Sequence, residues 1–459
     1  MRGASHSAGV HALRGLTCRS ASSAFAVGLA VFLCGCDDTS KGPHSSGSAT
    51  TSASADGVAS GAPGVAPSRS AELLPSGIRS PDATTSPEIA IANFDGQFEQ
   101  LERALKAKPD DLVFLRPTVG AYLDQVTYFG KMNAIERVLE LAERATNTNP
   151  KEPKAFFLRS SGRSMIHDFK AALADLDEAK RLGANEYELA PKRAVIAMAL
   201  GNYDAAEPVF AEEVKRFPNL NSLGLHAVCL GHMGKTAQAE AAFQAAEATY
   251  RDVSPFAIAW LYFNRAELWQ RAGDAERARA LYTIVVERLP SFARAAIHLS
   301  ELLPPARGKP FVEKVLPTSD DPEVSSALFL MNEALTPGSG KAHLERATKR
   351  YDELMAKYPL AFADHVAEFH LHATKDSKKA AEAAKINFAN RKTAESFDLY
   401  VEALVAAGDV KMACQVADEA AEFKYPTRAL RLQRMAAYRA CGKPALADAL
   451  ATGLPASKP

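Results

Sequence analysis

One stretch near residue 365 carries two histidines and a glutamate at a spacing that could ligate a metal ion. In the sequence ADHVAEFHLH, His365, Glu368 and His372 follow one another at intervals of three and four residues. Side chains so spaced share one face of an α-helix, and imidazole with carboxylate is a common zinc ligand set. Two histidines with one glutamate also arise often by chance. We therefore predict polar contacts between packed helices and no metal.

A second stretch could be taken for a phosphate-binding loop, because Gly340-Lys341 precedes a helical pattern in PGSGKAHLE. A Walker motif needs a glycine five residues earlier, where Leu335 stands, and a hydroxyl after the lysine, where Ala342 stands. We predict an ordinary loop between helices. Nucleophile elbows, zinc-protease motifs and dinucleotide fingerprints are also missing from the sequence. We expect no cofactor and no enzyme, although a site assembled from distant segments remains the alternative.

The composition excludes several classes of partner. Lysine plus arginine equals aspartate plus glutamate at 54 each, so no overall charge favours nucleic acid or an anionic surface. Six cysteines occur in 459 residues, at positions 18, 34, 36, 229, 414 and 441. Three of them crowd into the first 36 residues, so the rest of the chain is not a disulfide scaffold.

The N-terminus has the layout of an export signal. Arg2, Arg14 and Arg19 stand among the first twenty residues without an acidic one, and an apolar run follows over 21–33. That run is about 13 residues, whereas a membrane-spanning helix needs about 20, so cleavage is favoured over a permanent anchor.

Residues 33–36, Leu-Cys-Gly-Cys, resemble the lipobox of bacterial lipoproteins. The resemblance implies a signal peptide over 1–36 and lipid attachment at Cys36, with the mature protein in the cell envelope on the inner or the outer membrane, facing the periplasm or the cell surface. An ordinary secreted protein cut nearby is the alternative. Residues 37–88 follow, and 37 of these 52 are Ser, Thr, Gly, Ala or Pro. Such a stretch buries too little apolar area to offset chain entropy, so we expect a disordered linker.

From residue 89 onward, apolar residues recur in blocks typical of consecutive α-helices. A small turn residue, an alanine five positions later and an aromatic or aliphatic residue four further on recur along the chain. The alanines stand at 172, 206, 239, 278, 347, 413 and 447, with gaps of 34, 33, 39, 69, 66 and 34. Two gaps are nearly doubled, and weaker units fit inside them near residues 312 and 380. Prolines at 150, 218, 290 and 359 stand where the second helix of a unit should end.

This pattern resembles the tetratricopeptide repeat family. The resemblance implies an all-α superhelical solenoid of about eight helix-turn-helix units, in which alanine stands where two antiparallel helices approach closely. We expect an N-terminal array over 89–301 and a C-terminal array over 322–459. Four prolines and a glycine in LLPPARGKPFVEKVLPTSDD break the rhythm, so we expect a break or hinge at 302–321.

In the repeat family, the first helix of each unit lines a concave groove. Its register implies groove positions for Trp260, Phe263, Glu267 and Gln270, and the residues we expect to bind a partner are Trp260, Phe263, Asn264, Glu267 and Arg271. The alternative is that the tryptophans only fill gaps between repeats.

The same register brings Cys414 and Cys441 to one edge of the solenoid. They stand near the beginning of one helix and near the end of its antiparallel neighbour, so a disulfide is possible. Two unrelated buried thiols are the alternative. Taken together, the sequence predicts a lipid-anchored envelope scaffold or assembly factor whose partners are other envelope proteins. A peptide- or glycan-binding receptor is the alternative function.

Overall fold

The computed structural model describes residue 78 and residues 83–452, and within these ranges the regular structure is helical throughout. The predicted signal peptide, with Cys36, and most of the predicted linker lie outside the described residues. None of the described helices holds an 18-residue stretch apolar enough to cross a lipid bilayer.

The helices follow one another as antiparallel hairpins after a single leading helix, α2 (Pro87–Ala107). The first six hairpins are α3 (Leu112–Phe129) with α4 (Ala134–Thr148), α5 (Pro153–Met165) with α6 (Phe169–Arg181), α7 (Glu186–Ala199) with α8 (Tyr203–Arg216), α9 (Leu220–His232) with α10 (Thr236–Thr249), α11 (Pro255–Ala272) with α12 (Ala275–Arg288), and α13 (Ala293–Glu301) with α14 (Pro305–Val315). The last four are α15 (Pro322–Leu335) with α16 (Lys341–Lys357), α17 (Pro359–Phe369) with α18 (Ser377–Asn390), α19 (Ala394–Ala407) with α20 (Val410–Glu419), and α21 (Arg428–Ala440) with α22 (Pro444–Ala451). The described residues thus form ten repeats, more than the eight expected.

The repeat period explains why each hairpin packs tightly. One position in every second helix is 0% exposed, namely Val138, Ala172, Ala206, Ala239, Ala278, Val312, Ala347, Ala380, Ala413 and Ala447. A small side chain there lets the two backbones approach closely. The four prolines expected at helix ends follow the C-caps of α4, α8, α12 and α16.

The proline-rich segment 302–321 contains helix α14, which completes the sixth repeat at the expected boundary between the two arrays. Pro305 occupies the first turn of this helix, where a missing N–H costs nothing. Gly308 lets α14 approach α13, since a Cβ at that position would lie 2.9 Å from Cα of Ser300. Valine replaces alanine at the close-contact position 312, which is why the repeat is weak in the sequence.

The last residues of the expected linker 37–88 contact the solenoid. The Thr85 N–H donates to the Val253 carbonyl at 2.7 Å, and Arg288 Nη1 lies 3.3 Å from Thr84 Oγ1. Helix α2 then begins at Pro87 and packs against α3. The residues just before the solenoid are therefore attached to the beginning of α11 and the end of α12.

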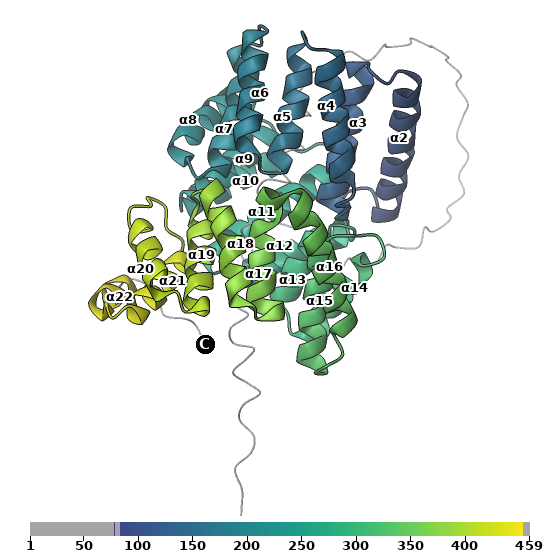
Figure 1. Cartoon of the computed structure of the whole chain (residues 1–459). Coiled ribbons are helices and arrows are strands. Elements are labelled where there is room, and N and C mark those ends of the chain that lie inside the picture. The colour runs from purple at the N-terminus through teal and green to yellow at the C-terminus, as the bar shows by residue number, and fades with distance from the viewer. Residues whose placement is uncertain (1–77, 79–82, 453–459) are drawn as a thin grey trace, which may run out of the picture.

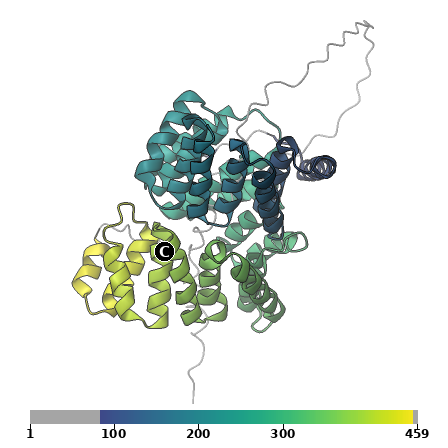
Figure 2. The same cartoon turned by 45° about the horizontal axis from the view of Figure 1, so that its top comes forward.

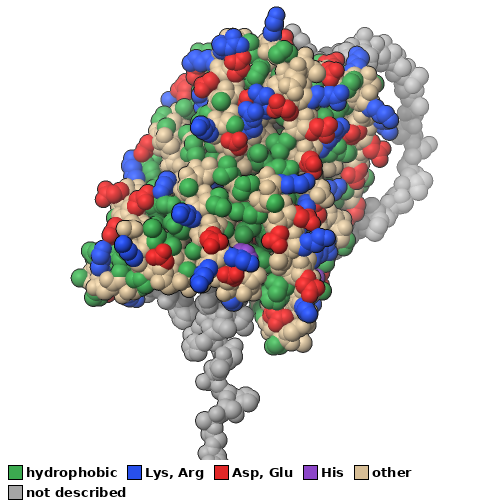
Figure 3. Space-filling view, in the orientation of Figure 1, with side chains coloured by type: hydrophobic (Ala, Val, Ile, Leu, Met, Phe, Trp, Pro, Cys, Tyr) green, Lys and Arg blue, Asp and Glu red, His purple; other side chains and the backbone are tan. Residues whose placement is uncertain are grey.

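The solenoid makes two coils that lie against each other. We call α3–α14 the N-terminal coil and α15–α22 the C-terminal coil; the first is blue to teal and the second green to yellow in Figure 1, and both remain distinct in the turned view of Figure 2. Helices α3, α9, α13, α17 and α19 each contact the next odd-numbered helix, so we call the surface along these first helices the inner face. On the outside, cationic and anionic side chains are interspersed over the face that Figure 3 shows.

The two coils meet along a line that we call the seam, where turns within N-terminal hairpins touch the loops that precede α15, α17, α19 and α21. Ser319 Oγ donates to the Gly130 carbonyl at 3.0 Å, across 189 residues of sequence. His167 Nδ1 lies 3.1 Å from the Leu360 carbonyl, across 193 residues. The turns of the first coil at Gly130 and His167 therefore contact parts of the second coil that follow about 190 residues later in the chain.

The seam continues at two further turns. A Cβ added to Gly201 would lie only 2.2 Å from the Lys392 carbonyl oxygen. Beyond it, Lys424 Nζ pairs with Asp204 at 2.8 Å, and both side chains are more than half exposed. The seam thus combines close backbone packing with polar contacts that are partly open to solvent.

Candidate functional site

The predicted partner-binding residues lie inside the molecule. Trp260, Phe263, Asn264 and Glu267 are buried, and Arg271 is half-buried. The Trp260 ring packs against α9, because a Cβ on Gly224 would lie 2.8 Å from its Cζ3. These side chains are therefore not accessible to a partner while the inner face is covered. Partner binding by these residues stays a prediction that requires the inner face to become accessible.

Charged side chains gather on the inner face of α11 and α13. Glu267 is 3% exposed and Arg294 is 8% exposed. Burial raises the pKa of Glu267, although Arg271 and Arg294 lie close enough to oppose the shift. Glu267 Oε1 and Arg294 Nε and Nη2 are buried without a hydrogen-bond partner. This part of the inner face therefore buries charged side chains whose polar atoms are not all hydrogen-bonded to neighbouring residues.

The inner face becomes richer in carboxylates toward the C-terminal coil. His298 Nδ1 lies 3.3 Å from Glu301, and His365 Nδ1 lies 3.7 Å from Glu323. Burial would lower the pKa of His298, but Glu301 outweighs it and the pKa is raised. Burial, with the nearby carboxylates of Asp364, Glu323, Glu301 and Glu402, raises the pKa of Glu368 well above its usual range.

His365, Glu368 and His372 do not come together as the sequence spacing allowed. Helix α17 ends at Phe369, and a π-helical turn over His370–Thr374 changes the direction of the side chains that follow. His365 instead faces Glu323 of α15. Among the described residues no group of three or more histidine, cysteine or acidic side chains is placed to hold a metal ion.

A buried ion pair joins the inner face to the seam. Arg391 Nη2 donates to Asp364 Oδ2, and both side chains are almost fully buried. Next to it, His167 has a φ of +58°, the left-handed conformation that glycine adopts at this turn in most other repeats. Asn390 Nδ2 donates to the His167 carbonyl at 3.0 Å. Contacts from the second coil thus stabilise a turn of the first coil whose backbone conformation is unfavourable for a residue other than glycine.

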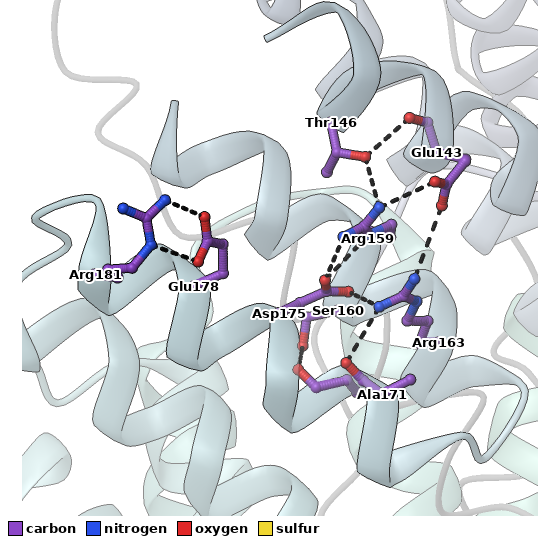
Figure 4. A network of polar contacts seen from close by, with 10 residues as sticks. Glu143, Thr146, Arg159, Ser160, Arg163, Ala171, Asp175, Glu178 and Arg181 are labelled. Atoms are coloured by element: carbon purple, nitrogen blue, oxygen red, sulfur yellow. Dashed lines mark hydrogen bonds and ion pairs between the residues drawn. The ribbon is translucent and has the colours of Figure 1, made fainter. Parts of the chain in front are cut away.

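A further polar cluster, shown in Figure 4, holds three consecutive helices together. Asp175 of α6 is buried and accepts from Arg159 Nη2 at 2.8 Å and from Arg163 Nη1 at 2.9 Å. Arg159 also contacts Glu143 of α4 at 3.0 Å. Burial raises the pKa of Asp175 against the opposing effect of Arg159. Because these contacts join α4, α5 and α6, we interpret the cluster as a clamp between two repeats.

Two other motifs from the sequence have clear places in the structure. The main-chain N–H groups of Gly338 and Gly340 donate to Glu333 at 2.8 and 2.9 Å, so the loop before α16 is closed by its own carboxylate. Cys414 of α20 and Cys441 at the end of α21 are joined as a disulfide, with their Cα atoms 6.4 Å apart. Cys229 is a buried free thiol.

Four side chains of this region, Arg294, His298, Glu323 and Glu395, were not predicted from the sequence. Arg294 and His298 lie in α13, the first helix of the repeat that seemed degenerate. Counting the unit near residue 312 as complete would have assigned these two side chains to the inner face. Glu395 lies 3.6 Å from His232 across the seam, and no local pattern signals such a long-range contact.

This chain resembles known proteins only in the arrangement of its helices. Neither a protein-family model nor a curated protein matches this chain. Among solved structures, the Cut9 and Hcn1 hetero-tetramer of the APC/C is similar at 13% identity over 79% of this chain and 70% of that one, with a TM-score of 0.46. A tetratricopeptide repeat protein from Parabacteroides merdae is similar at 14% identity over 55% of this chain and 98% of that one, with a TM-score of 0.33.

Yeast Tom70 is similar at 12% identity over 79% of this chain and 88% of its own, with a TM-score of 0.32. The fold assignment rests on the chain itself: ten antiparallel hairpins, a fully buried small residue in each second helix, and glycine in the left-handed conformation at Gly201, Gly234, Gly273, Gly408 and Gly442. The described part of this protein is a superhelical solenoid of tetratricopeptide-type repeats.

Proposed function

We propose that this protein is a lipid-anchored scaffold of the bacterial cell envelope that holds a partner protein on the inner face of its solenoid. The observation that carries the proposal is the inner face itself, where polar and charged side chains of α11, α13, α15, α17 and α19 follow one another along successive repeats. A repeat array of this kind presents an extended surface to a macromolecule.

The location follows from the leader and the linker. Lipid on Cys36 would place the mature chain at a membrane, and residues 37–82 would separate it from the solenoid. The expected partners are therefore other envelope proteins.

The anchor is tested with Cys36→Ser in the full-length chain. We expect the wild type to enter the detergent phase and the variant to leave the membrane fraction after a salt wash, because the described helices include no membrane-spanning segment. A variant that stays in the membrane fraction would contradict the lipid anchor.

Partner binding is tested with a photo-crosslinking amino acid placed at Glu402, on the inner face, and at Lys349, on the outer helix α16. Crosslinking in cells followed by mass spectrometry should yield a defined protein adduct from position 402 that position 349 lacks. Equal labelling from both positions, or bound glycan without a protein adduct, would overturn the scaffold.

A further inference from the structure

A cavity of about 420 Å³ lies between the leading helix α2 and the second helix of the first repeat, α4. Both helices pack against α3 (Figure 1). Cavities of roughly 300 to 1,000 Å³ commonly hold small-molecule ligands. Because α2 precedes the repeats and α4 is an outer helix, this cavity is separate from the inner face.

Cationic side chains from both helices line the cavity, namely Arg103 and Lys106 of α2 and Arg137 and Arg144 of α4. Arg103 and Lys106 are exposed and stand three residues apart, so they are neighbours on one helix face. Arg137 and Arg144 are half-buried and stand seven residues apart, about 10 Å along the helix axis. An anion in the cavity would therefore meet nitrogen donors from two helices.

The two arginines of α4 are paired with carboxylates at the surface. Arg137 Nη1 donates to Glu140 at 2.6 Å, and the Glu140 side chain is 58% exposed. Arg144 Nε donates to Asp110 at 2.9 Å, and the Asp110 side chain is 54% exposed. Pairs that are this open to solvent contribute little to stability. Both arginines can therefore turn toward a bound anion at small cost.

Glu102 is the one acidic side chain among the described residues that line the cavity. Its carboxylate is close to Tyr122 of α3: burial and Glu102 raise the pKa of this tyrosine, while Arg137 opposes the rise. The lining thus carries four cations against one carboxylate. Such an excess of donors favours a ligand group with several acceptor oxygens. A phosphate group meets this need better than a single carboxylate, because its oxygens can accept from several guanidinium and ammonium groups at once.

We propose that the cavity between α2 and α4 is a binding site for a phosphate group, carried by a small soluble ester or by the headgroup of a lipid. The four cations donate to the phosphate oxygens, and the bound ligand joins the leading helix to the first repeat. The site does not involve the inner face, so this inference does not depend on the proposed function.

The test is isothermal titration calorimetry of the purified full-length protein in a nonionic detergent. Glycerol 3-phosphate probes the soluble ester, with glycerol as its control, and dihexanoyl phosphatidylglycerol probes the lipid headgroup, with dihexanoyl glycerol as its control. We expect a phosphate probe to bind with an affinity that falls as salt is added, and its control not to bind. Tighter binding of glycerol 3-phosphate would identify a soluble ester as the ligand, and tighter binding of the lipid would identify a headgroup.

Three variants locate the binding in the cavity. Arg103→Gln with Lys106→Gln removes two exposed cations of the lining and should weaken binding of the phosphate probe at least tenfold. Lys180→Gln with Arg181→Gln removes the same charge from the exposed end of α6 and should leave binding unchanged. Glu102→Gln removes the carboxylate that repels the ligand and should strengthen binding severalfold, which misfolding cannot produce.

Three results would overturn the inference: no binding of either phosphate probe, equal binding of a phosphate probe and its control, or equal weakening by the two double variants. The cations of α2 would then only stabilise the C-terminal end of that helix through its dipole. Photo-crosslinking at position 402 tests the scaffold separately, so a failure of the phosphate site would leave the proposed function standing.

Discussion

Replacing Gly201 by alanine tests whether the seam is a real contact between the coils. Gly201 has a φ of +86°, and a Cβ there would lie 2.2 Å from the carbonyl oxygen of Lys392. The left-handed conformation alone costs an alanine about 1 to 2 kcal/mol. The clash is with backbone, which cannot rotate away, and overpacking of this kind adds about 1 to 3 kcal/mol. We expect a total loss of about 2 to 5 kcal/mol, unless the coils separate to relieve the clash.

Gly234→Ala is the matched control. Gly234 holds the same turn position in the next repeat with a φ of +72°, and a Cβ there would meet nothing within 4 Å. This variant should lose only the conformational part, about 1 to 2 kcal/mol. The difference between the two variants therefore isolates the seam.

The assays are urea unfolding followed by circular dichroism and small-angle X-ray scattering of the folded proteins. Gly201→Ala should either unfold at clearly lower urea than Gly234→Ala or show a larger radius of gyration. Equal unfolding midpoints together with unchanged dimensions would refute the argument that the turn at Gly201 packs against Lys392.

Three other predictions follow from the described contacts. Mass spectrometry of unreduced, alkylated protein should yield a peptide pair linked through Cys414 and Cys441, and free thiols at both positions would contradict this prediction. Because the disulfide closes a loop of 27 residues, its removal should lower the free energy of unfolding by about 3 to 4 kcal/mol. Burial lowers the pKa of His167 to about 3, so this side chain stays neutral in the folded state, whereas in the unfolded chain it gains a proton below about pH 6.5. The free energy of unfolding should therefore fall by about 2 kcal/mol between pH 6.5 and pH 5. Urea unfolding at these two pH values should show that His167→Asn removes this part of the loss. Asp175→Asn leaves two arginines without their buried carboxylate and should lower the free energy of unfolding by about 3 to 5 kcal/mol, whereas Glu178→Gln, at an exposed ion pair, should leave it almost unchanged; similar losses would show that the clamp is not special.

The local pattern of the sequence was sufficient to predict the repeat unit. Alanines such as Ala172 and Ala278 stand at the close helix contact, and Pro218 and Pro290 follow helix ends, because both requirements act within one hairpin. The repeat within 302–321 was harder to recognise, because its prolines and its valine depart from the pattern. Pro305 begins a helix there, and Val312 fills the alanine position.

The candidate site was harder to predict because the register of one repeat does not show how its neighbours pack against it. Trp260 and Phe263 were assigned to a groove on that register. In the structure a Cβ on Gly224 of α9 would lie 2.8 Å from the Trp260 ring, and the Phe263 ring centroid lies 5.0 Å from that of Phe292. The approach of Glu395 to His232 depends in addition on how much the solenoid curves per repeat. That curvature is the sum of many small helix-packing angles, and no single motif encodes it.

The offset of about 190 residues across the seam also limits how this solenoid can change in evolution. In an open array each repeat contacts its neighbours alone, so a unit can be gained or lost without disturbing the others. Here Gly130 meets Ser319 and His167 meets Leu360 at nearly equal separations. Deleting one intervening repeat would shift every such pair out of register at once. The number of repeats that separates two contacting residues along the chain should therefore be as constrained as the residues themselves. Duplication of a repeat should be tolerated only beyond the last seam contact, at the C-terminal end.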